Sequence, residues 1–492
     1  MNTAILSIDQ GTTSSRAIVF SLEGEIIAVS QLEHKQIYPN HGWVEHNPEE
    51  IWQNVLKVCD SAIKQANKKG YTPVTIGITN QRETVIAWDK NTGKTLYNAI
   101  VWQDKRTADK CNQLKIKHQN IVQEKTGLPM DPYFSASKME WLLENVAEVK
   151  TAAENKTLAF GTIDSFLLWK LTNGKTHATD ITNASRTLLF NIHTHEWDGE
   201  LLEFFNIPEH SLAEVLANTD EFGTTTVSEF LLDLPIQAMI GDQQSASIGQ
   251  ACFKNGMLKS TYGTGCFAML NTGTKPIFSK NGLITTIAYK LNDEVFYALE
   301  GSIFIAGAAI QWLRDSLSII TNANETESLA SSANDNDDVY FVPAFTGLAA
   351  PHWSADAKAS ISGMTLDTDK AVLVRSALDS VAFQTKDLIN AMVEDIGEPI
   401  SELRVDGGMV VNRWLMQRIA DILDVTVEIP KVSETTALGA SYLAGLQHGL
   451  YNSLDDISEN WQLEQKFSST MDAEIRNRKL AGWNNAVSKV LG

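Results

Sequence analysis

Hydrophobic and polar positions along the chain follow two patterns, one typical of strands and one typical of helices. Runs rich in β-branched residues at 3–9 and 16–22 flank a Gly-Thr-Thr-Ser turn and predict a β-hairpin. Residues 74–80 and 84–89 show the same pattern, so a second hairpin is expected there. Because such strands alternate with helical segments, the pattern favours an α/β protein.

Three segments carry apolar residues at helical spacing. They are residues 49–70, which end in Lys-Lys-Gly, residues 138–146 and residues 372–397. Residues 302–313 form a further apolar run, which is too short to span a membrane and is expected to be a buried helix. Residues 321–337 are polar and acidic, and we expect a surface loop there.

One pattern recurs at long range. The strand, Gly/Thr turn and strand of residues 5–20 return at residues 258–270. This recurrence favours two halves of similar design, residues 1–250 and 251–492, and its period is too long for a solenoid. Gly/Thr hairpins are common, so a chance repeat is the alternative explanation.

Composition and charge mainly exclude classes of protein and of binding partner. A chain of 492 residues, 43% hydrophobic and 20% charged, is typical of a globular protein with about two to four domains. A formal net charge of −20 argues against nonspecific binding to nucleic acid or acidic membranes. Four scattered cysteines give no disulfide framework and favour a reducing cytoplasm. The chain start lacks a signal-peptide pattern, and no apolar run is long enough for membrane insertion.

The turn of the first hairpin carries groups that can bind phosphate. Its glycine permits a tight turn whose N–H groups point at one centre. Hydroxyl donors follow at Thr12, Thr13 and Ser14, and Arg16 adds a permanent charge. Asp9, at the end of an apolar strand, could hold Mg²⁺ through water. The alternative is a polar hairpin with an exposed aspartate.

Two later Gly-rich turns could complete a polyphosphate site. The second turn offers the Thr264 hydroxyl, although taken alone it is an ordinary turn. Residues 403–423 predict a strand, two glycines and a helix. There Gly408 lets a flat ligand lie against the backbone, and Asn412 can hydrogen-bond it. Residues 300–311 could add a further wall. None of these turns matches a P-loop or a GxGxxG motif.

A phosphoryl acceptor also needs a base and orienting groups. Asp242 follows an apolar strand beside Gln243, where its carboxylate can accept a hydroxyl proton. Such a base contributes about 10²–10⁴-fold to a rate, whereas the alternative role, capping the next helix, is equally compatible with the spacing. The adjacent Arg82 and Glu83 lie in a turn, where spacing alone indicates an exposed ion pair.

Blocks along most of the chain resemble the FGGY family of carbohydrate kinases. They include DQGTTSSR (9–16), GWVEHNP (42–48), GITNQRET (77–84), DPYFSASK (131–138), GDQQ (241–244), YGTGCF (262–267), RVDGG (404–408) and TALGASYLAG (436–445). The blocks keep their order to about residue 450. The resemblance implies an α/β fold in which two related actin-like ATPase (ribonuclease H-like) domains enclose a cleft for ATP and substrate.

Within that family the blocks most resemble members that phosphorylate glycerol, and the roles below are what this resemblance implies. The implied glycerol pocket consists of Arg82, Glu83, Trp102, Tyr133, Asp242, Gln243 and Phe267, with Asp242 as the base. On composition alone, the two aromatics Trp102 and Tyr133 would be core residues.

The same resemblance implies the nucleotide site and the reaction. The ATP contacts would be Thr12, Thr13, Ser14, Arg16, Thr264, Gly307, Gln311, Gly408 and Asn412, with Mg²⁺ near Asp9. The implied reaction converts ATP and glycerol to ADP and sn-glycerol 3-phosphate. Relatives form dimers and tetramers, so a homo-oligomer is expected.

Some positions depart from the family pattern. Val372 and Ala349 differ from its usual residues, but neither is an implied contact. Residues 227–242 lack the Gly pair and arginine that bind fructose 1,6-bisphosphate in some relatives, and residues 220–233 contain no regulatory histidine, so neither control is expected. A pentulose kinase on the same fold is the nearest alternative function. A chaperone or cytoskeletal ATPase would need a further module, and none is expected after residue 450.

Overall fold

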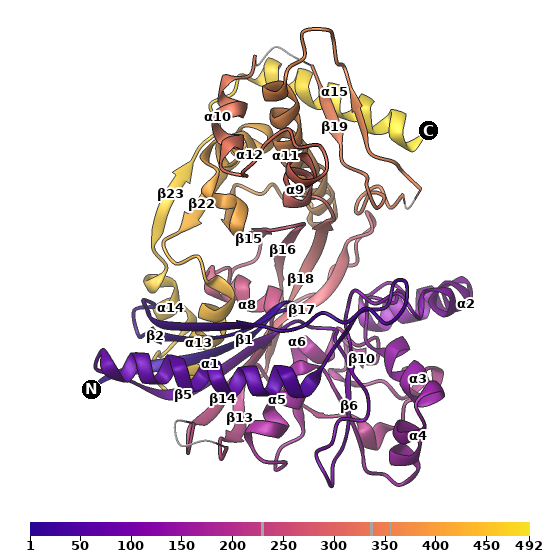
Figure 1. Ribbon diagram of the computed structural model, residues 1–492, viewed down its shortest axis with the longest axis vertical. Coiled ribbons are helices and arrows are strands. Elements are labelled where there is room, and N and C mark those ends of the chain that lie inside the picture. The colour runs from indigo at the N-terminus through magenta and orange to yellow at the C-terminus, as the bar shows by residue number, and fades with distance from the viewer. Residues whose placement is uncertain (228–230, 335–337, 355) are drawn as a thin grey trace.

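Two mixed sheets organise the chain. A computed structural model describes residues 1–227, 231–334, 338–354 and 356–492 (Figure 1). A six-stranded sheet lies in the lower half of that view and a seven-stranded sheet in the upper half. Residues 228–230, inside the stretch expected to lack both controls, and residues 335–337, at the end of the expected surface loop, lie outside the described residues.

The first sheet contains the predicted N-terminal hairpin. Its strands in spatial order are β13 (Thr219–Thr224), β14 (Pro235–Gly241), β5 (Tyr71–Asn80), β1 (Asn2–Gln10), β2 (Ser14–Ser21) and β3 (Ile26–Glu33). Strands β1 and β2 are antiparallel with Asp9 opposite Arg16, which confirms the hairpin. Strand β5 runs parallel to both β1 and β14, so the carboxyl ends of these three strands share one edge of the sheet.

The second sheet repeats this arrangement with one extra strand. Its strands in spatial order are β17 (Ile284–Leu291), β18 (Glu294–Ile303), β16 (Cys266–Gly273), β15 (Leu258–Tyr262), β21 (Glu402–Asp406), β22 (Thr426–Pro430) and β23 (Leu463–Phe467). Here β15 and β16 form the hairpin, and β15, β21 and β22 run parallel. The order β3-β2-β1-β5-β14-β13 thus corresponds to β18-β16-β15-β21-β22-β23, and the two halves are related as the recurrence predicted.

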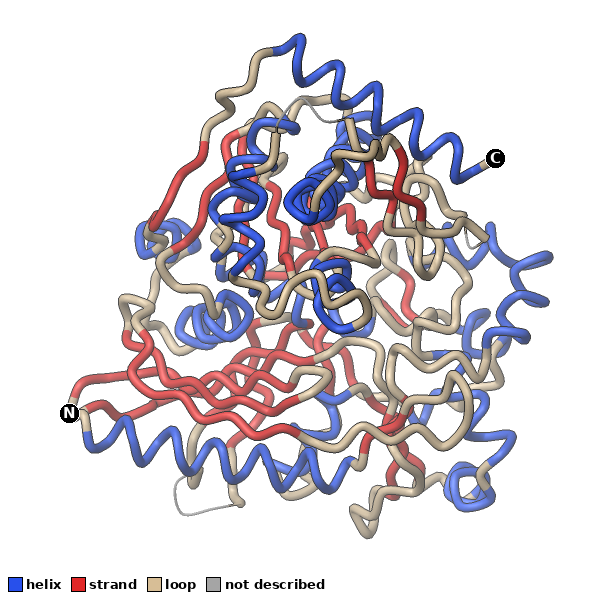
Figure 2. Tube along the Cα trace, turned by 45° about the horizontal axis from the view of Figure 1, so that its top comes forward, coloured by secondary structure: helices blue, strands red, loops and turns tan. Residues whose placement is uncertain are grey.

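Helices cover both faces of the first sheet because β1 alternates its apolar side chains. Leu6 and Ile8 pack in the cluster that contains helix α1 (Pro48–Lys68), which runs along the outer face of the sheet (Figure 2). Ile5 points the other way, into a cluster with α13 (Thr435–Gln447). This alternation is the period of two that strand geometry imposes.

Helix α13 comes late in the sequence but packs on the first sheet. It also crosses α8 (Asp242–Gly249) so closely that a Cβ on Gly439 would lie 1.9 Å from the Ser245 carbonyl oxygen. Only glycine fits at such a crossing. We call the part of the molecule built around the six-stranded sheet the first lobe and the part built around the seven-stranded sheet the second lobe. Sequence order alone therefore does not separate the two lobes, and the boundary near residue 250 stays a prediction.

The remaining elements complete the two lobes. In the first they are β4 (Glu45–His46), β6 (Ile86–Asp89), β7 (Ala99–Ile100), α2 (Ala108–Thr126), α3 (Ala136–Asn145), α4 (Ala147–Glu154), β8 (Leu158–Gly161), α5 (Ile163–Leu171), β9 (Ala178–Asp180), α6 (Ile181–Ala184), β10 (Phe190–Asn191), β11 (Glu196–Trp197), α7 (Gly199–Phe204) and β12 (Glu214–Leu216). In the second they are α9 (Gly307–Asp315), α10 (Glu325–Ser332), β19 (Tyr340–Val342), β20 (Ser360–Ser362), α11 (Lys370–Ile396), α12 (Arg413–Leu423), α14 (Leu454–Asn460) and α15 (Ala473–Leu491).

The predicted long helices are present as α1, α3 and α11, but three local predictions are wrong. Residues 74–89 form no hairpin, because β5 pairs with β1 and β14 while β6 pairs with β8. Residues 302–303 end strand β18, so the helix expected from residue 302 begins only at Gly307. The expected loop 321–337 contains helix α10, whose Thr326 and Ala330 are buried. In each case long-range packing overrode the local pattern.

In the described part of the chain, neither a membrane-spanning helix nor a disulfide is found. None of its helices is long and apolar enough to cross a lipid bilayer. Its four cysteines are free, in agreement with the lack of a disulfide framework expected from the sequence, and all four are buried.

Candidate active site

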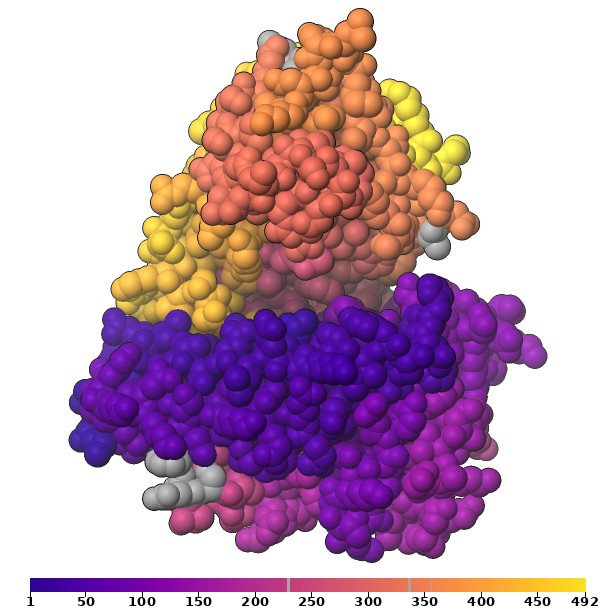
Figure 3. Space-filling view, viewed as in Figure 1, coloured from indigo at the N-terminus to yellow at the C-terminus, as the bar shows by residue number. Residues whose placement is uncertain are grey.

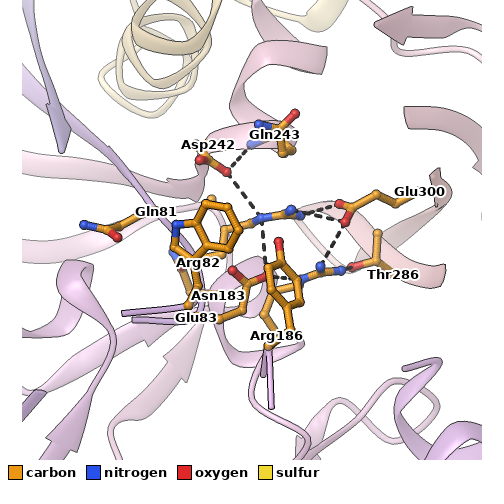
Figure 4. Close-up of polar contacts among 12 residues, drawn as sticks. Gln81, Arg82, Glu83, Asn183, Arg186, Asp242, Gln243, Thr286 and Glu300 are labelled. Atoms are coloured by element: carbon orange, nitrogen blue, oxygen red, sulfur yellow. Dashed lines mark hydrogen bonds and ion pairs between the residues drawn. The ribbon is translucent and has the colours of Figure 1, made fainter. Parts of the chain in front are cut away.

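The two central residues of the expected acceptor pocket meet because their strands are neighbours. Asn80 and Gly241, the last residues of β5 and β14, are paired in register. Arg82 and Asp242 follow these strand ends, at the edge where α/β sheets bind ligands. The Nε atom of Arg82 lies 3.3 Å from Oδ1 of Asp242 (Figure 4).

Arg82 is buried, contrary to the exposed ion pair that strand spacing alone indicated. The side chains of Arg82 and Glu83 are each 2% exposed, and Arg82 Nε lies 3.7 Å from Glu83 Oε1. The local pattern failed because the contacts that bury Arg82 come partly from the second sheet, which is distant in sequence. A buried guanidinium requires compensating carboxylates, and the structure supplies a further one.

That carboxylate is Glu300 of β18, which binds two arginines at once. Arg82 donates from Nη1 to Glu300 Oε2 at 2.5 Å and from Nη2 to Oε1 at 3.2 Å. Arg186 donates from Nη2 to Glu300 Oε1 at 2.9 Å and from Nε to Glu83 Oε1 at 2.8 Å. Sequence reasoning placed Glu300 only in a stretch that could add a wall to the nucleotide site, and it assigned no role to Arg186. The available signal was a lone carboxylate in an apolar strand, where an unpaired charge is costly.

Asp242, the expected base, can hold a proton near neutral pH. Removal from bulk water raises the pKa of Asp242 to about 6, against the opposing effect of the Arg82 guanidinium. Its side chain is 30% exposed, so a substrate can reach it. Asp242 is the first residue of α8 and accepts a hydrogen bond from the Gln243 backbone N–H at 2.7 Å. The cap residue of α8 is Gly241, and α8 has no side-chain capping hydrogen bond. The geometry is therefore compatible with a base, whereas the alternative role of Asp242 as the cap of this helix is wrong, because the cap position falls one residue earlier, at Gly241.

The neighbouring Gln243 is oriented by a lysine that sequence reasoning missed. Lys259 of β15 is buried, and its Nζ donates to Gln243 Oε1 at 2.6 Å. Burial lowers the pKa of this lysine, while Asp406 and Asp242 oppose that change. With its oxygen occupied, the Gln243 amide has its Nε2 donor left for a ligand.

The expected aromatic residues lie at the same end of the fold. Trp102 and Tyr133 pack edge to face with ring centroids 5.5 Å apart, and both are partly exposed. Phe267, also partly exposed, lies on β16 opposite Ser302 of β18, the strand that carries Glu300. The residues expected to form the acceptor pocket thus come from both lobes.

Trp102 connects the expected acceptor pocket with the first loop that is expected to bind phosphate. Its indole Nε1 donates to the Thr12 hydroxyl at 2.9 Å. The turn that holds Thr13 is closed by a hydrogen bond from the Gly11 N–H to the Ser14 carbonyl at 2.9 Å. One tryptophan therefore contacts the expected acceptor site on one side and the expected phosphate site on the other.

Arg16 of this hairpin is engaged by carboxylates. It pairs with Asp9 and, through Nη1 at 2.7 Å, with Glu434, which precedes α13. The Arg16 side chain is 27% exposed, whereas Asp9 is buried. A phosphate contact by Arg16 would require it to exchange at least one of these partners.

The second loop packs onto the start of α9. The Thr264 carbonyl accepts hydrogen bonds from the N–H groups of Ala306 and Ala308, both at 3.0 Å, and the Gly307 N–H donates to Gly263 at 3.0 Å. Thr264 is exposed, as is Gln311 one turn along α9. The structure therefore brings Thr264 and Gly307 together and places Gln311 on the same helix.

The third loop contrasts two adjacent glycines. Gly407 has φ +93°, and a Cβ there would lie 2.4 Å from the Tyr262 carbonyl oxygen. A Cβ on Gly408 would meet nothing within 4 Å. Asn412 caps α12 by accepting from the Leu415 N–H at 2.9 Å. The Asn412 amide is therefore already used, while the space beside Gly408 is open to a ligand.

The molecular surface is hollowed between the lower and upper lobes. Figure 3 shows this recess, with the chain near residues 250–300 at its floor. The strand ends and loops described above border the junction between the two sheets (Figure 1).

Comparisons with known proteins agree with this architecture. Residues 4–249 match the N-terminal domain model of the FGGY family of carbohydrate kinases, and residues 258–448 match its C-terminal domain model. "Glycerol kinase 1" of Pseudomonas aeruginosa is 54% identical over 491 residues, covering 100% of this chain and 99% of the relative. "Glycerol kinase 2" of Thermotoga maritima is 52% identical over 489 residues, covering 99% of each.

Solved structures extend the likeness to the fold. Plasmodium falciparum glycerol kinase with ADP superposes with a TM-score of 0.95 at 42% identity, covering 100% of this chain and 99% of that one. Gluconate kinase of Lactobacillus acidophilus has a TM-score of 0.88 at 20% identity, over 100% and 99% of the two chains. At that lower identity the likeness shows the fold alone. It matches the predicted two-domain actin-like ATPase architecture.

Proposed function

Because the chain belongs to the FGGY family of carbohydrate kinases, we propose that it is a glycerol kinase, which transfers the γ-phosphoryl group of ATP to glycerol. The products are ADP and sn-glycerol 3-phosphate. Full-length relatives that carry the glycerol kinase name at 52–54% identity support the assignment of substrate. The observation that carries the mechanism is the placement of Asp242 beside Arg82, with an Nε–Oδ1 distance of 3.3 Å.

Asp242 acts as the general base. Its carboxylate accepts the proton of the attacking glycerol hydroxyl as the oxygen bonds to phosphorus, and ADP leaves with the electrons of the broken P–O bond. A base contributes about 10²–10⁴-fold, while positioning and charge neutralisation account for most of phosphoryl transfer. The pKa of about 6 leaves Asp242 mostly ionised at neutral pH, yet able to take a proton.

The remaining pocket residues bind and orient the polyol. Arg82 and Gln243 supply donors for the hydroxyl groups, and Glu83 supplies an acceptor. The rings of Trp102 and Phe267 cover the carbon atoms, and Tyr133 packs against Trp102. Glycerol offers little apolar area, so directed hydrogen bonds must provide most of its affinity and specificity.

The three loops bind ATP. The first supplies the hydroxyls of Thr12, Thr13 and Ser14, with Arg16 nearby, and the second supplies Thr264. Contacts to the rest of the nucleotide come from Gly307, Gln311, Gly408 and Asn412. The expected role of Asn412 then falls to its backbone or to an amide released from its capping role.

Asp9 is the residue that would hold Mg²⁺. No group of three or more His, Cys, Asp or Glu side chains among the described residues could bind a metal by itself. A single buried carboxylate fits Mg²⁺, which usually retains water and binds substrate phosphates with one or two carboxylates. When bound, the ion supplies neutralisation of the phosphate charge.

The cytoplasm is the compartment that the free cysteines support, because such thiols persist in reducing conditions. The homo-oligomeric state stays a prediction.

A coupled ADP-release assay tests the proposal. Glycerol, dihydroxyacetone, erythritol and xylulose are supplied in turn with ATP and Mg²⁺, and a reaction without polyol is the control. We expect the highest kcat/KM with glycerol. ADP release without any polyol would point to an ATPase of another class. Xylulose far ahead of glycerol would instead assign the chain to the pentulose kinases of the same fold.

A further inference from the structure

Glu300 lies at the point where the second lobe meets the expected acceptor pocket. Strand β18, which carries it, belongs to the seven-stranded sheet. Its carboxylate contacts Arg82 and Arg186, both of the first lobe, at distances from 2.5 to 3.2 Å. The exposed fractions of these three side chains are 3%, 2% and 0%. A pairing so deeply buried differs from a surface ion pair, because water cannot replace a lost partner.

The guanidinium of Arg82 faces two different carboxylates, Glu300 with one edge and Asp242 with another. Its two Nη atoms both face Glu300, and Nη1 also lies 3.2 Å from Gln244 Oε1. Only its Nε faces Asp242, at 3.3 Å. Figure 4 shows Glu300 and Asp242 on different sides of this guanidinium. The planar fork of arginine thus points its two-pronged end at Glu300, the geometry that gives the strongest pairing with a carboxylate.

We propose that Glu300 is a positioning residue of the acceptor site, which holds Arg82 by its Nη atoms and thereby keeps Asp242 free to serve as the base. This inference rests on the proposed function. In this arrangement Glu300 makes no contact with the reacting atoms. It competes with Asp242 for Arg82, and the stronger pairing goes to Glu300.

The charges around Asp242 support this division. The groups that act on it are Arg82 and Glu83 after β5 and Lys259 on β15. Arg186 pairs with Glu300, which in turn pairs with Arg82. Burial alone would raise the pKa of the Glu300 carboxyl, but Arg186 and Arg82 lower it to about 2, so Glu300 is ionised wherever the enzyme works.

Loss of the Glu300 charge should change the state of Asp242. Arg82 would then have only Asp242 and Glu83 as carboxylate partners, and its guanidinium could turn toward Asp242. A closer cation stabilises the ionised carboxylate, which lowers its pKa and makes it a weaker base. Both the direct loss of a negative charge and the turn of Arg82 act in this direction.

The test is Glu300→Gln, which preserves shape and removes the charge. We expect the acidic limb of kcat/KM against pH to move to lower pH by about one unit or more. We expect kcat at neutral pH to fall less than in Asp242→Asn, with the KM for ATP little changed. Glu294→Gln is the matched control, because it is the same substitution at the exposed start of β18, and it should leave the profile in place.

A second measurement separates this proposal from the proposed function. Carboxyl ¹³C NMR of aspartate-labelled protein, with the Asp242 signal assigned by Asp242→Asn, follows the titration of Asp242 without any turnover. A lower Asp242 pKa in Glu300→Gln supports the proposal even in a protein that rejects glycerol. An unchanged Asp242 pKa in a folded Glu300→Gln protein overturns it.

A conservative variant keeps the test decisive if Glu300→Gln does not fold. Glu300→Asp retains the charge on a shorter side chain. We expect its acidic limb to stay near that of the unsubstituted protein while kcat falls, because the charge remains but Arg82 is held less well. If the acidic limb of Glu300→Asp moves to lower pH by the amount expected for Glu300→Gln, the Glu300 charge has no role and the proposal is contradicted.

Discussion

The proposed acceptor pocket and the proposed nucleotide loops differ in what defines their shape. The acceptor pocket depends on charged side chains that are buried and paired between the two lobes, as Arg82, Arg186 and Glu300 show. The nucleotide loops depend on backbone turns and hydroxyl groups, with Thr264 exposed and Arg16 27% exposed. Substitutions in the first region should therefore change charge states and stability together. In the second region they should act mainly through the shape of the backbone.

The largest expected effect breaks the chemistry of the acceptor pocket alone. Asp242→Asn removes the base but keeps its size and part of its hydrogen bonding. We expect kcat to fall by about 10²–10⁴-fold while glycerol binding, measured by calorimetry, is nearly unchanged. Asp293→Asn, at an exposed turn of the second sheet, is the control. A kcat that survives in Asp242→Asn would make Asp242 an orienting residue.

Arg82→Ala breaks the side-chain pairing on which that pocket depends. It leaves the Glu300 carboxylate with Arg186 as its remaining arginine, so the free energy of unfolding in urea should fall by about 3–5 kcal/mol, the cost of breaking a buried pair. Glycerol affinity should fall with it, while ATP affinity is spared.

The matched control for Arg82 is an exposed arginine. Arg314 is 41% exposed and pairs only with its neighbour Asp315 among the contacts described. Arg314→Ala should leave both unfolding and glycerol binding nearly unchanged. Equal loss of ATP and glycerol affinity in Arg82→Ala would place Arg82 outside the acceptor pocket.

Gly407 and Gly408 test the backbone character of the nucleotide loops. Gly407→Ala forces a side chain into φ +93° and against the Tyr262 carbonyl. We expect a loss of about 1–3 kcal/mol in unfolding free energy. Gly408→Ala meets open space, so thermal unfolding should change little while nucleotide affinity falls. If both substitutions destabilise the fold equally, the open space beside Gly408 is not a ligand site.

A change of pH is the smallest perturbation that tests the comparison between the acceptor pocket and the nucleotide loops. The Asp242 pKa is raised to about 6, and in the proposed mechanism the ionised form is the active base. The value of kcat/KM for glycerol should therefore fall as pH drops through 6, by about tenfold at pH 5. Binding of ATP, measured separately by calorimetry, should lack this step because its loops do not depend on Asp242. A flat profile between pH 5 and 7 would contradict the assignment.

Much of the site could be predicted because its signals are local. Asp242 follows a strand that its apolar residues reveal, and the Gly/Thr hairpins carry their own turn residues. The burial of Arg82 could not be predicted, since it depends on Glu300, which comes from the second sheet. The capping contact of Asn412 with the Leu415 N–H is local, whereas the hydrogen bond from the Asn412 amide to Thr326 joins distant segments and has no local signal. The false hairpin at 74–89 has the same cause, because β5 finds its partners at β1 and β14 rather than next in sequence.

The sequence by itself determined the strands, the turns, the long helices and the family to which the chain belongs. Each follows from a short-range pattern of apolar residues, glycines and hydroxyls that needs no distant partner. Only the tertiary structure decided which charges meet. Arg82 and Glu300 are 218 residues apart, and no pattern in either segment indicates that the two residues pair. Their pairing is set by how the second sheet packs against the first, because a buried charge must find its partner through the whole fold.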